Sequence, residues 1–211
     1  MGEAEAGTEA VLAGEPDPGK RRAVQQAMQI GQRYGRAAQA GEVPAGLAEA
    51  YRHADAQALS KIRFALGLDQ VRAAVCGAAP VAAPTLEFML GLGITVAEGW
   101  GMSECLLGTI NPYHAIRLGT AGKAVPGMQL RLASDGELLV RGPTVMKGYR
   151  NDPEKTARAI DADGWLHTGD LARIDDDGYV TITGRKKDII NAAGKNISPP
   201  TSRTPCSLPA R

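Results

Sequence analysis

Two charged residues, Asp170 and Arg185, stand fifteen positions apart across a segment that is typical of two strands joined by a turn. Asp170 closes the run GWLHTGD, and Arg185 stands at the head of the run RKKD. A carboxylate accepts hydrogen bonds from both hydroxyls of a vicinal diol, and a guanidinium donates hydrogen bonds to them. Because ribose is the commonest such diol, the two residues predict a ribose-binding site.

A second candidate is the run GWGMSE at residues 99–104. Its glycines, including Gly101, let the backbone approach a ligand closely. Trp100 offers a face for stacking, Ser103 offers a hydroxyl, and Glu104 offers an oxygen ligand suited to Mg²⁺. Without further context the run could also be a tight turn that carries a surface glutamate, so both interpretations stay open.

A third candidate comprises Gly77, Ala78, Ala79 and Pro80, which follow an apolar stretch at residues 71–76. A turn with such small side chains would let a flat ligand lie against the backbone. An ordinary turn between a strand and a helix explains the same four residues equally well.

The run GEPDPGKR at residues 14–21 nearly matches a phosphate-binding loop. However, Arg21 replaces the hydroxyl that would coordinate the metal, and Glu15 and Asp17 would repel phosphate. We therefore expect a flexible linker there and no nucleotide site.

The composition excludes several classes of protein. With 24 basic and 23 acidic residues in a chain of 211, the net charge of +1 does not indicate nucleic-acid binding. The mean hydropathy of −0.18 and the lack of a long apolar run predict no transmembrane segment, although peripheral membrane association stays open. Cys76, Cys105 and Cys206 have no metal-like spacing and form no even disulfide set, which favours a reducing cytoplasm.

The elements that must position these candidates begin with an α/β part. Apolar residues at helical spacing predict helices over residues 20–40 and 47–66. Strands predicted at residues 71–76 and 94–97 flank a further helix at residues 84–90. This order indicates a βαβ unit, whose ligands usually bind at the carboxyl ends of its strands.

The second half of the chain has the pattern of an antiparallel β subdomain. Asp-Gly turns separate its short predicted strands. These strands are expected at residues 129–132, 137–141, 171–174 and 180–183. Between them, Asp152 is expected to cap a helix that has Pro153 at its first position and runs through Ile160.

In combination, the motifs resemble those of the adenylate-forming superfamily, which includes acyl-CoA synthetases, peptide-synthetase adenylation domains and luciferases. The resemblance covers roughly residues 60–200, and the sequence of residues 184–199 is most similar to that of long-chain fatty acyl-CoA synthetases. It implies part of the large α/β domain of those enzymes, followed by their antiparallel β subdomain and truncated at both ends.

The resemblance implies a role for each candidate residue. Trp100, where tyrosine is usual, would stack on adenine, Ser103 would meet the α-phosphate, and Glu104 would help to hold Mg²⁺. Asp170 and Arg185 would bind ribose. The remaining positions are Gly77, Ala78, Ala79, Pro80 and Gly101, which would line the adenine and carboxylate pocket, and Lys187, which would be the hinge of a small C-terminal domain.

The composition, the pattern and the resemblance together indicate an organisation along the chain. We expect a disordered segment, a partial α/β subdomain, a β-rich subdomain, a hinge that begins the C-terminal domain, and a tail that suggests a frameshift. Their expected bounds are residues 1–19, 20–116, 117–186, 187–200 and 201–211.

The implied reaction joins a fatty acid or related carboxylic acid to ATP, releasing pyrophosphate, before CoA sulfur displaces AMP to form a thioester. The family's phosphate-binding loop and catalytic lysine have no counterpart in this sequence. Because such electrostatic stabilisation changes rates by about a thousandfold, we expect little activity from this chain alone. The alternatives are a non-catalytic remnant that at most binds adenine nucleotide, a piece of another adenylate-forming enzyme, and a β-rich interaction module.

Overall fold

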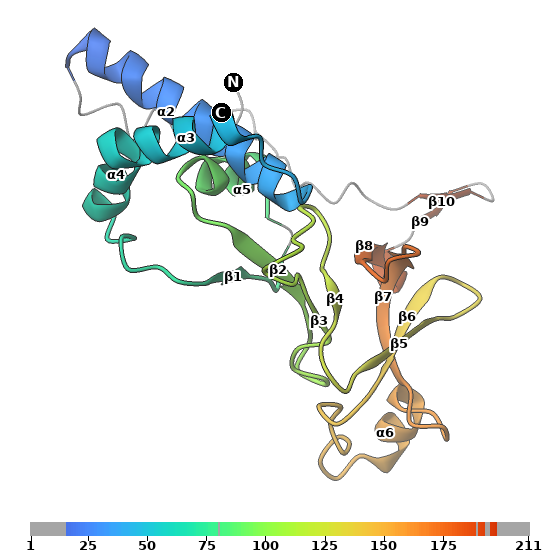
Figure 1. Ribbon diagram of the computed structural model, residues 1–211. Helices are drawn as coiled ribbons and strands as arrows, with labels where there is room; N and C mark the ends of the chain where they lie inside the picture. Colours follow the sequence, from blue (N-terminus) through green and yellow to red (C-terminus); the bar gives the residue numbers. More distant parts are fainter. Residues whose placement is uncertain (1–15, 80, 189, 193–194, 198–211) are drawn as a thin grey trace, which may run out of the picture. The chain divides into compact units, whose positions relative to one another are not determined.

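The structure is a computed structural model in which helices pack in one compact unit and antiparallel strands in another (Figure 1). It describes residues 16–79, 81–188, 190–192 and 195–197, with the last two ranges described as backbone only. Within these residues, the first unit comprises the chain up to Cys76 together with Val81–Glu98 and Asn111–Gly119. The second unit comprises residues 77–79, Gly99–Ile110 and the described residues from Thr120 onward.

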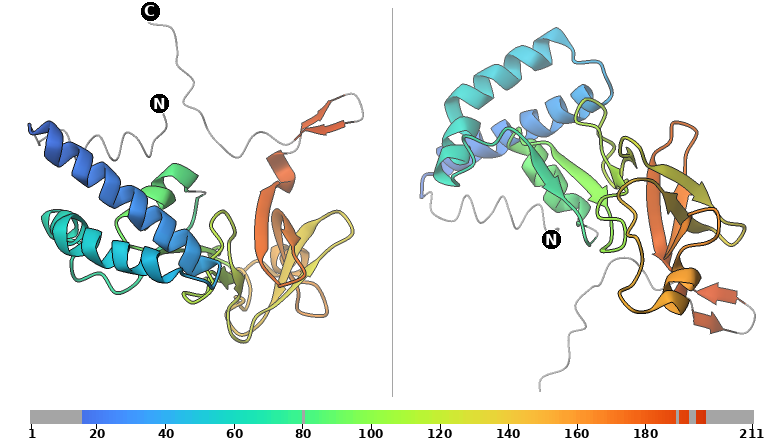
Figure 2. Two further views of the ribbon diagram at one scale, coloured as in Figure 1. Left: turned by 45° about the horizontal axis from the view of Figure 1, so that its top comes forward. Right: turned by 90° about the horizontal axis from the view of Figure 1, so that it is seen from below.

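The first unit begins with a helical layer. Its members are α2 (Pro18–Gln39), α3 (Ala45–Ala54), a π-helical turn (Asp55–Leu59) and α4 (Ser60–Ala65). Tyr34 and Tyr51 stack with ring centroids 4.0 Å apart, where α2 and α3 run alongside each other (Figure 2). The apolar stripe predicted from the sequence therefore faces a real core, in which Met28 and Leu59 are buried.

The start of α2 corrects one expectation. Asp17 caps this helix, with its Oδ1 accepting hydrogen bonds from Gly19 N at 2.7 Å and Lys20 N at 3.4 Å. Residues 16–20 therefore form a helix start, because a carboxylate satisfies amides that a linker would leave to water. The rest of the segment expected to be disordered, residues 1–15, lies outside the described residues.

The predicted βαβ unit is present in the first unit. It consists of β1 (Ala74–Cys76), α5 (Ala83–Gly91) and β2 (Val96–Trp100). The two strands are parallel, with Ala74 opposite Val96 and Cys76 opposite Glu98. Leu86 and Ile94 pack beneath them in a small core of their own.

The last two residues of β2 belong to the second unit. They pair with β3 (Thr109–Ile110), which pairs in turn with β4 (Lys123–Ala124), and both pairings are antiparallel. The predicted boundary at residues 116/117 therefore needs correction, because residues 99–110 group with the β-rich unit. The physical reason is burial: Trp100 and Cys105 pack into the core of that unit.

Four antiparallel strands make up the main sheet of the second unit. In spatial order they are β5 (Gln129–Leu132), β6 (Glu137–Arg141), β7 (Leu166–Ile174) and β8 (Val180–Arg185). Helix α6 (Pro153–Ala159) connects β6 to β7, and Asp152 caps it by accepting a hydrogen bond from Lys155 N at 2.9 Å. Strand β7 begins five residues before the predicted strand, so the run that ends at Asp170 lies inside the sheet.

A 3-10 turn (Lys186–Asp188) follows β8, and the backbone of β9 (Ile190–Ala192) pairs with β10 (Lys195–Ile197) in a short hairpin. The expected tail at residues 201–211 lies outside the described residues. No helix among the described residues is long and apolar enough to span a membrane.

Candidate functional site

The candidate ribose residue Asp170 sits in a bulge of β7. His167 lies opposite Leu139 and Leu171 lies opposite Glu137, so three residues of β7 face a single residue of β6. A bulge of this kind turns side chains away from the regular alternation of a strand. Asp170 is thereby re-aimed within the sheet.

Side chains hold the bulge in place. Thr168 Oγ1 donates a hydrogen bond to the Leu138 carbonyl oxygen at 2.6 Å and accepts one from Asp170 N at 3.1 Å. Gly169 has φ +72°, a conformation that favours glycine, and its N–H donates to Glu137 Oε1 at 2.8 Å. Thr168 and Gly169 therefore stabilise the bulge that carries Asp170.

The structure brings the two predicted ribose residues together. Asp170 lies opposite Arg185 in the β7–β8 register, and Arg185 Nε lies 3.1 Å from Asp170 Oδ1. Asp170 is only 5% exposed, whereas the Arg185 side chain is 56% exposed. The carboxylate is thus buried, whereas the guanidinium is open to solvent.

Trp100 joins this pair through its indole nitrogen. Trp100 Nε1 donates a hydrogen bond to Asp170 Oδ2 at 2.8 Å, so each carboxylate oxygen has a different partner. Trp100 is 9% exposed, and its ring packs against Gly108, where an added Cβ would lie 2.6 Å from the ring. The sequence alone does not reveal this hydrogen bond, because its two residues lie 70 positions apart in the chain.

Glu104 is anchored at both its side chain and its backbone. Its Oε1 accepts a hydrogen bond from the Tyr149 hydroxyl at 2.8 Å, and its carbonyl oxygen accepts one from Met146 N at 2.7 Å. The hydrogen bond to Glu104 raises the pKa of Tyr149 above its usual value. Ser103 lies beside Glu104 in the same turn and is exposed.

Glu104 could hold Mg²⁺ only together with oxygen atoms that a bound ligand supplies. Among the described residues, no three His, Cys, Asp or Glu side chains gather as a metal cluster. Mg²⁺ is commonly held by one or two carboxylates together with substrate phosphates, which is the donor set that Glu104 and a nucleotide would supply.

The two glycine-containing motifs meet at their backbones. A Cβ at Gly77 would lie 2.7 Å from the Gly99 carbonyl oxygen, and a Cβ at Gly101 would collide with the Leu106 carbonyl oxygen. Ala78 has φ +68°, which is uncommon for a residue with a side chain. Ala79 follows in the same turn, and Pro80 lies outside the described residues. These glycines are therefore required by the chain's own packing.

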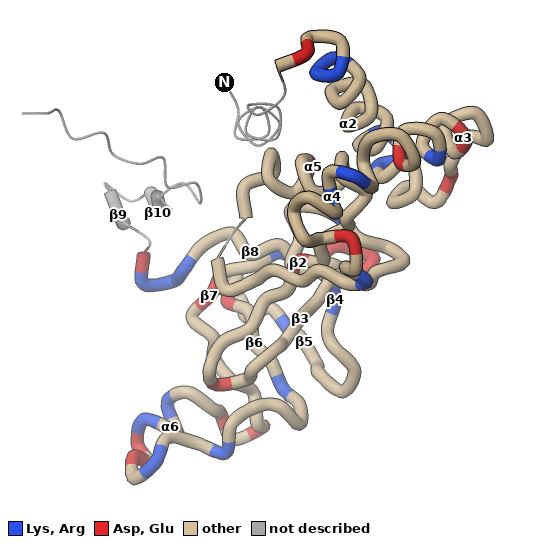
Figure 3. The backbone as a smooth tube through the Cα atoms, turned by 90° about the vertical axis from the view of Figure 1, so that its left-hand side faces the viewer, with Lys and Arg blue, Asp and Glu red and all other residues tan. Residues whose placement is uncertain are grey.

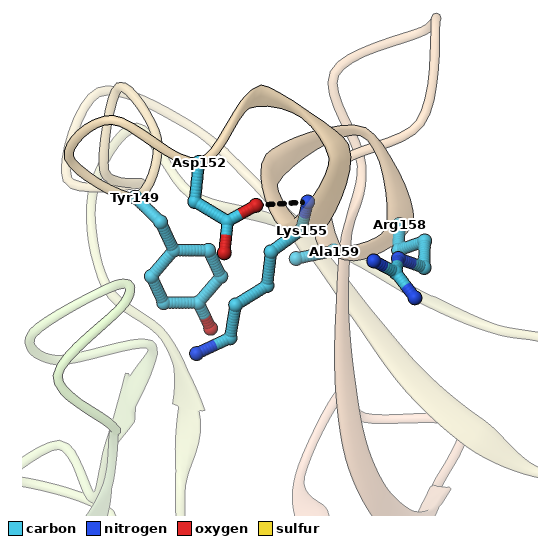
Figure 4. A pocket seen from close by; sticks show the side chains of 5 residues that line it. All are labelled: Tyr149, Asp152, Lys155, Arg158 and Ala159. Atoms are coloured by element: carbon cyan, nitrogen blue, oxygen red, sulfur yellow. Dashed lines mark hydrogen bonds between the residues drawn. The ribbon is translucent and has the colours of Figure 1, made fainter.

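A hollow in the second unit has Tyr149 in its lining (Figure 4). The hydroxyl of Tyr149 is the group that donates to Glu104. Lys155 Nζ lies over the Tyr149 ring, 4.1 Å from its centroid. The Asp152 carboxylate caps α6 in the same wall. The lining residues are Tyr149, Asp152, Lys155, Arg158 and Ala159.

The predicted hinge residue Lys187 is exposed in the 3-10 turn after β8. Its neighbour Lys186 makes the ion pairs there, with Nζ 2.8 Å from Glu137 Oε2 and 2.6 Å from Asp135 Oδ2. Glu137 is 4% exposed. Burial alone raises the pKa of Glu137, but hydrogen bonds from Lys186, Gly169 N–H and His167 outweigh it and hold the pKa below its usual value.

No local pattern marks Glu137 as a site residue. It opens the run ELLVR after an Asp-Gly turn, where a strand-terminal glutamate would ordinarily face solvent. Its partners Gly169 and Lys186 lie 32 and 49 positions further along the chain, so the sequence does not show its surroundings.

Comparison with protein families matches residues 22–150 to the family described as AMP-binding enzyme. A putative fatty-acid–CoA ligase, FadD11, of Mycobacterium tuberculosis strain H37Rv is 52% identical over 198 residues, which cover 92% of this chain and 34% of that protein. The long-chain fatty-acid–CoA ligase FadD15 of Mycobacterium bovis is 50% identical over 66% of this chain and 23% of its own length. The chain thus spans about a third or less of the curated relatives it matches.

Solved structures agree with these relatives. ATP-bound MatB from Rhodopseudomonas palustris is 39% identical with a TM-score of 0.59, over 63% of this chain and 29% of that one. The O-succinylbenzoate coenzyme A synthetase MenE of Bacillus subtilis, solved with ATP and magnesium, is 28% identical with a TM-score of 0.55, over 66% of this chain and 33% of that one. The mixed α/β architecture is therefore that of part of such enzymes.

Proposed function

This chain belongs to the AMP-binding enzyme family, and from that premise we propose that its second unit binds the ribose of ATP or AMP through Asp170 and Arg185. The observation that carries the proposal is the buried Asp170 carboxylate, fixed by Arg185 on one oxygen and by Trp100 on the other. A carboxylate with restricted motion loses little conformational entropy when a diol binds.

The charges around Asp170 suit a neutral diol. Each carboxylate oxygen has a second lone pair that can accept from a ribose hydroxyl while the existing partner stays in place. The half-exposed Arg185 guanidinium carries further N–H donors for the hydroxyl oxygens. The pair therefore offers both acceptors and donors, as a vicinal diol requires.

The other candidate residues would serve the rest of the nucleotide. We assign Gly77, Ala78 and Ala79 to the adenine pocket, Ser103 to the α-phosphate, and Glu104 to a Mg²⁺ ion shared with the phosphates. Trp100 is assigned first to orienting Asp170, and adenine stacking on its ring stays a prediction. Mg²⁺ would neutralise phosphate charge, while Tyr149 keeps the Glu104 carboxylate in position.

For the whole enzyme of which such a chain is a part, we propose ligation of a fatty acid to CoA. Attack of the carboxylate oxygen on the α-phosphorus of ATP would give an acyl-adenylate and pyrophosphate, and the CoA sulfur would then displace AMP. The mycobacterial relatives, named as fatty-acid–CoA ligases, support this assignment. The part described here would contribute nucleotide binding, in the cytoplasm or against a membrane surface.

A non-catalytic adenine-nucleotide binder is the second candidate. The same Asp170 geometry favours it, because binding a ribose requires no acyl or CoA site. Binding of nucleotide is accordingly the property to test first, and turnover the property that separates the two candidates.

Replacing Asp170 by Ala should abolish AMP binding, because the diol loses its only proposed carboxylate acceptor. The measurement is isothermal calorimetry of AMP with the 211-residue chain, using Asp176→Ala as the control. Asp176 is exposed in the β7–β8 turn, so its removal should leave AMP affinity unchanged. Equal affinity in the Asp170→Ala variant would refute the ribose assignment.

A further inference from the structure

We propose that Glu137 is a positioning residue of the ribose site, which fastens the bulge carrying Asp170 to the segment carrying Arg185. The inference rests on the proposed function in that it takes Asp170 and Arg185 as the ribose ligands. It goes further by assigning the relative placement of these ligands to a buried carboxylate on a different strand, β6.

The first half of the fastening is at the bulge. Three residues of β7 face one of β6, so the N–H of Gly169 falls outside the regular ladder of hydrogen bonds. An unpaired backbone N–H away from water is costly. Glu137 Oε1 accepts this N–H at 2.8 Å, immediately before Asp170 in the chain.

The second half is at the end of β8. Glu137 Oε2 accepts a hydrogen bond from Lys186 Nζ at 2.8 Å, and Lys186 directly follows Arg185. Asp135 Oδ2 holds the same ammonium group at 2.6 Å. The two oxygens of one carboxylate therefore hold two different segments, each adjacent to one ribose ligand.

Because Glu137 is buried, the groups that hydrogen-bond to its carboxylate are restricted in position. A charged carboxylate that is 4% exposed requires partners for its lone pairs, because desolvation of an unpaired charge is costly. His167 Nδ1, 3.3 Å from Oε2, is a further neighbour, and Asp161 Oδ2 lies 3.9 Å from the other ring nitrogen. Any shift of the bulge or of Lys186 would break a bond to a buried charge.

The chain contains a direct reporter of Asp170. Its two tryptophans are Trp100, whose indole N–H donates to Asp170, and Trp165, whose ring lies under Arg131 and Arg141. The indole N–H resonances in a ¹H–¹⁵N spectrum therefore separate a change at Asp170 from a general change in the unit.

The test compares Glu137→Gln with Lys186→Met in the 211-residue chain. Glutamine keeps an acceptor for Gly169 N–H and loses the charge that holds Lys186, whereas methionine removes the cation from a half-exposed side chain. Both variants should move the Trp100 indole resonance and leave that of Trp165 in place. Lys147→Met, at an exposed lysine, should move neither.

Nucleotide binding provides the second readout. AMP affinity should fall by about tenfold in both variants, while affinity for 2′,3′-dideoxy-AMP stays the same, because only ribose recognition depends on the placement of Asp170. A purely structural role would weaken both ligands equally. Lys186→Arg, which retains a cation, should restore most of the AMP affinity.

The outcomes distinguish the two proposals. If the Trp100 resonance moves in the variants but no form of the chain binds AMP, Glu137 positions Asp170 and the nucleotide assignment fails. An unmoved Trp100 resonance in Lys186→Met overturns the positioning role, even if Glu137→Gln does not fold.

Discussion

At the scale of single residues, the site depends on which atom holds each oxygen of Asp170. Arg185 and Trp100 take one oxygen each, so the carboxylate is oriented before any ligand arrives. Preorganisation of this kind favours binding because little ordering remains to be done. The indole nitrogen of Trp100 therefore orients the proposed ribose ligand, separately from the stacking predicted for its ring.

Trp100→Phe tests that importance. Phenylalanine keeps much of the buried apolar surface and removes the N–H, which leaves a buried carboxylate oxygen without this donor. We expect a loss of about 1–3 kcal/mol in the free energy of unfolding, measured by urea titration followed by circular dichroism. Trp165→Phe, which leaves Asp170 untouched, should not weaken AMP binding. Unchanged stability and AMP affinity in Trp100→Phe would contradict the hydrogen bond's role.

At the scale of helices, strands and turns, two turns of the site require glycine for different reasons. Gly169 needs a positive φ but has no atom within 4 Å of an added Cβ. Gly101, by contrast, would place a Cβ against the Leu106 carbonyl oxygen. The first constraint is conformational and the second is steric.

Gly101→Ala should therefore destabilise the chain more than Gly169→Ala. An alanine at Gly169 costs about 1–2 kcal/mol for its left-handed backbone, whereas one at Gly101 must displace backbone. Thermal unfolding of both variants against the unsubstituted chain gives the order. The reverse order would mean that the turn after Gly101 relaxes easily.

The pairing of β6 with the end of β8 has a pH dependence of its own. The folded pKa of Glu137 lies below its ordinary value of 4.5, and the pKa of Asp135 is also lowered through the hydrogen bond from Lys186. Below about pH 4.5 the unfolded chain therefore binds protons that the folded chain resists. The stabilisation is present above that pH and is lost as the pH falls through the folded pKa values.

Lys186→Met should weaken this acid sensitivity. Without the ammonium group, burial raises the pKa of Glu137 and opposes the lowering by its remaining partners. The free energy of unfolding, measured in urea at pH 7 and at about pH 3.5, should differ less between the two pH values than in the unsubstituted chain. Lys147→Met is the matched control, and an identical acid loss in both variants would speak against the pair.

At the scale of the whole molecule, the distribution of charged residues along the described chain does not indicate a polyanionic partner. Figure 3 shows Lys and Arg interspersed with Asp and Glu along the described chain, including the region around α6. This agrees with a net charge of +1. The proposed ribose site defines the expected ligand more narrowly than the surface charge does.

Much of the fold was predictable because its signals are local. The strands over residues 129–132 and 137–141 and the cap at Asp152 follow from Asp-Gly turns and helix-start chemistry, and the structure confirms them. The pairing of Asp170 with Arg185 was predictable from the intervening turn.

The bulge in β7 and the bonds that depend on it were not predictable. A bulge is set by register between strands far apart in the sequence, so neither Glu137 nor the Trp100 indole shows a local pattern. The grouping of residues 99–110 with the second unit has the same origin, because burial of Trp100 and Cys105 is a tertiary property.

The most direct measurement is calorimetric titration of the 211-residue chain with AMP and, separately, with 2′,3′-dideoxy-AMP. The two ligands differ only in the hydroxyls that Asp170 and Arg185 are proposed to bind. We expect AMP to bind at least about tenfold more tightly, since hydrogen bonds to charged groups contribute about 1.5–3 kcal/mol each. Equal affinities for the two ligands, or no binding of AMP, would contradict ribose recognition by this site.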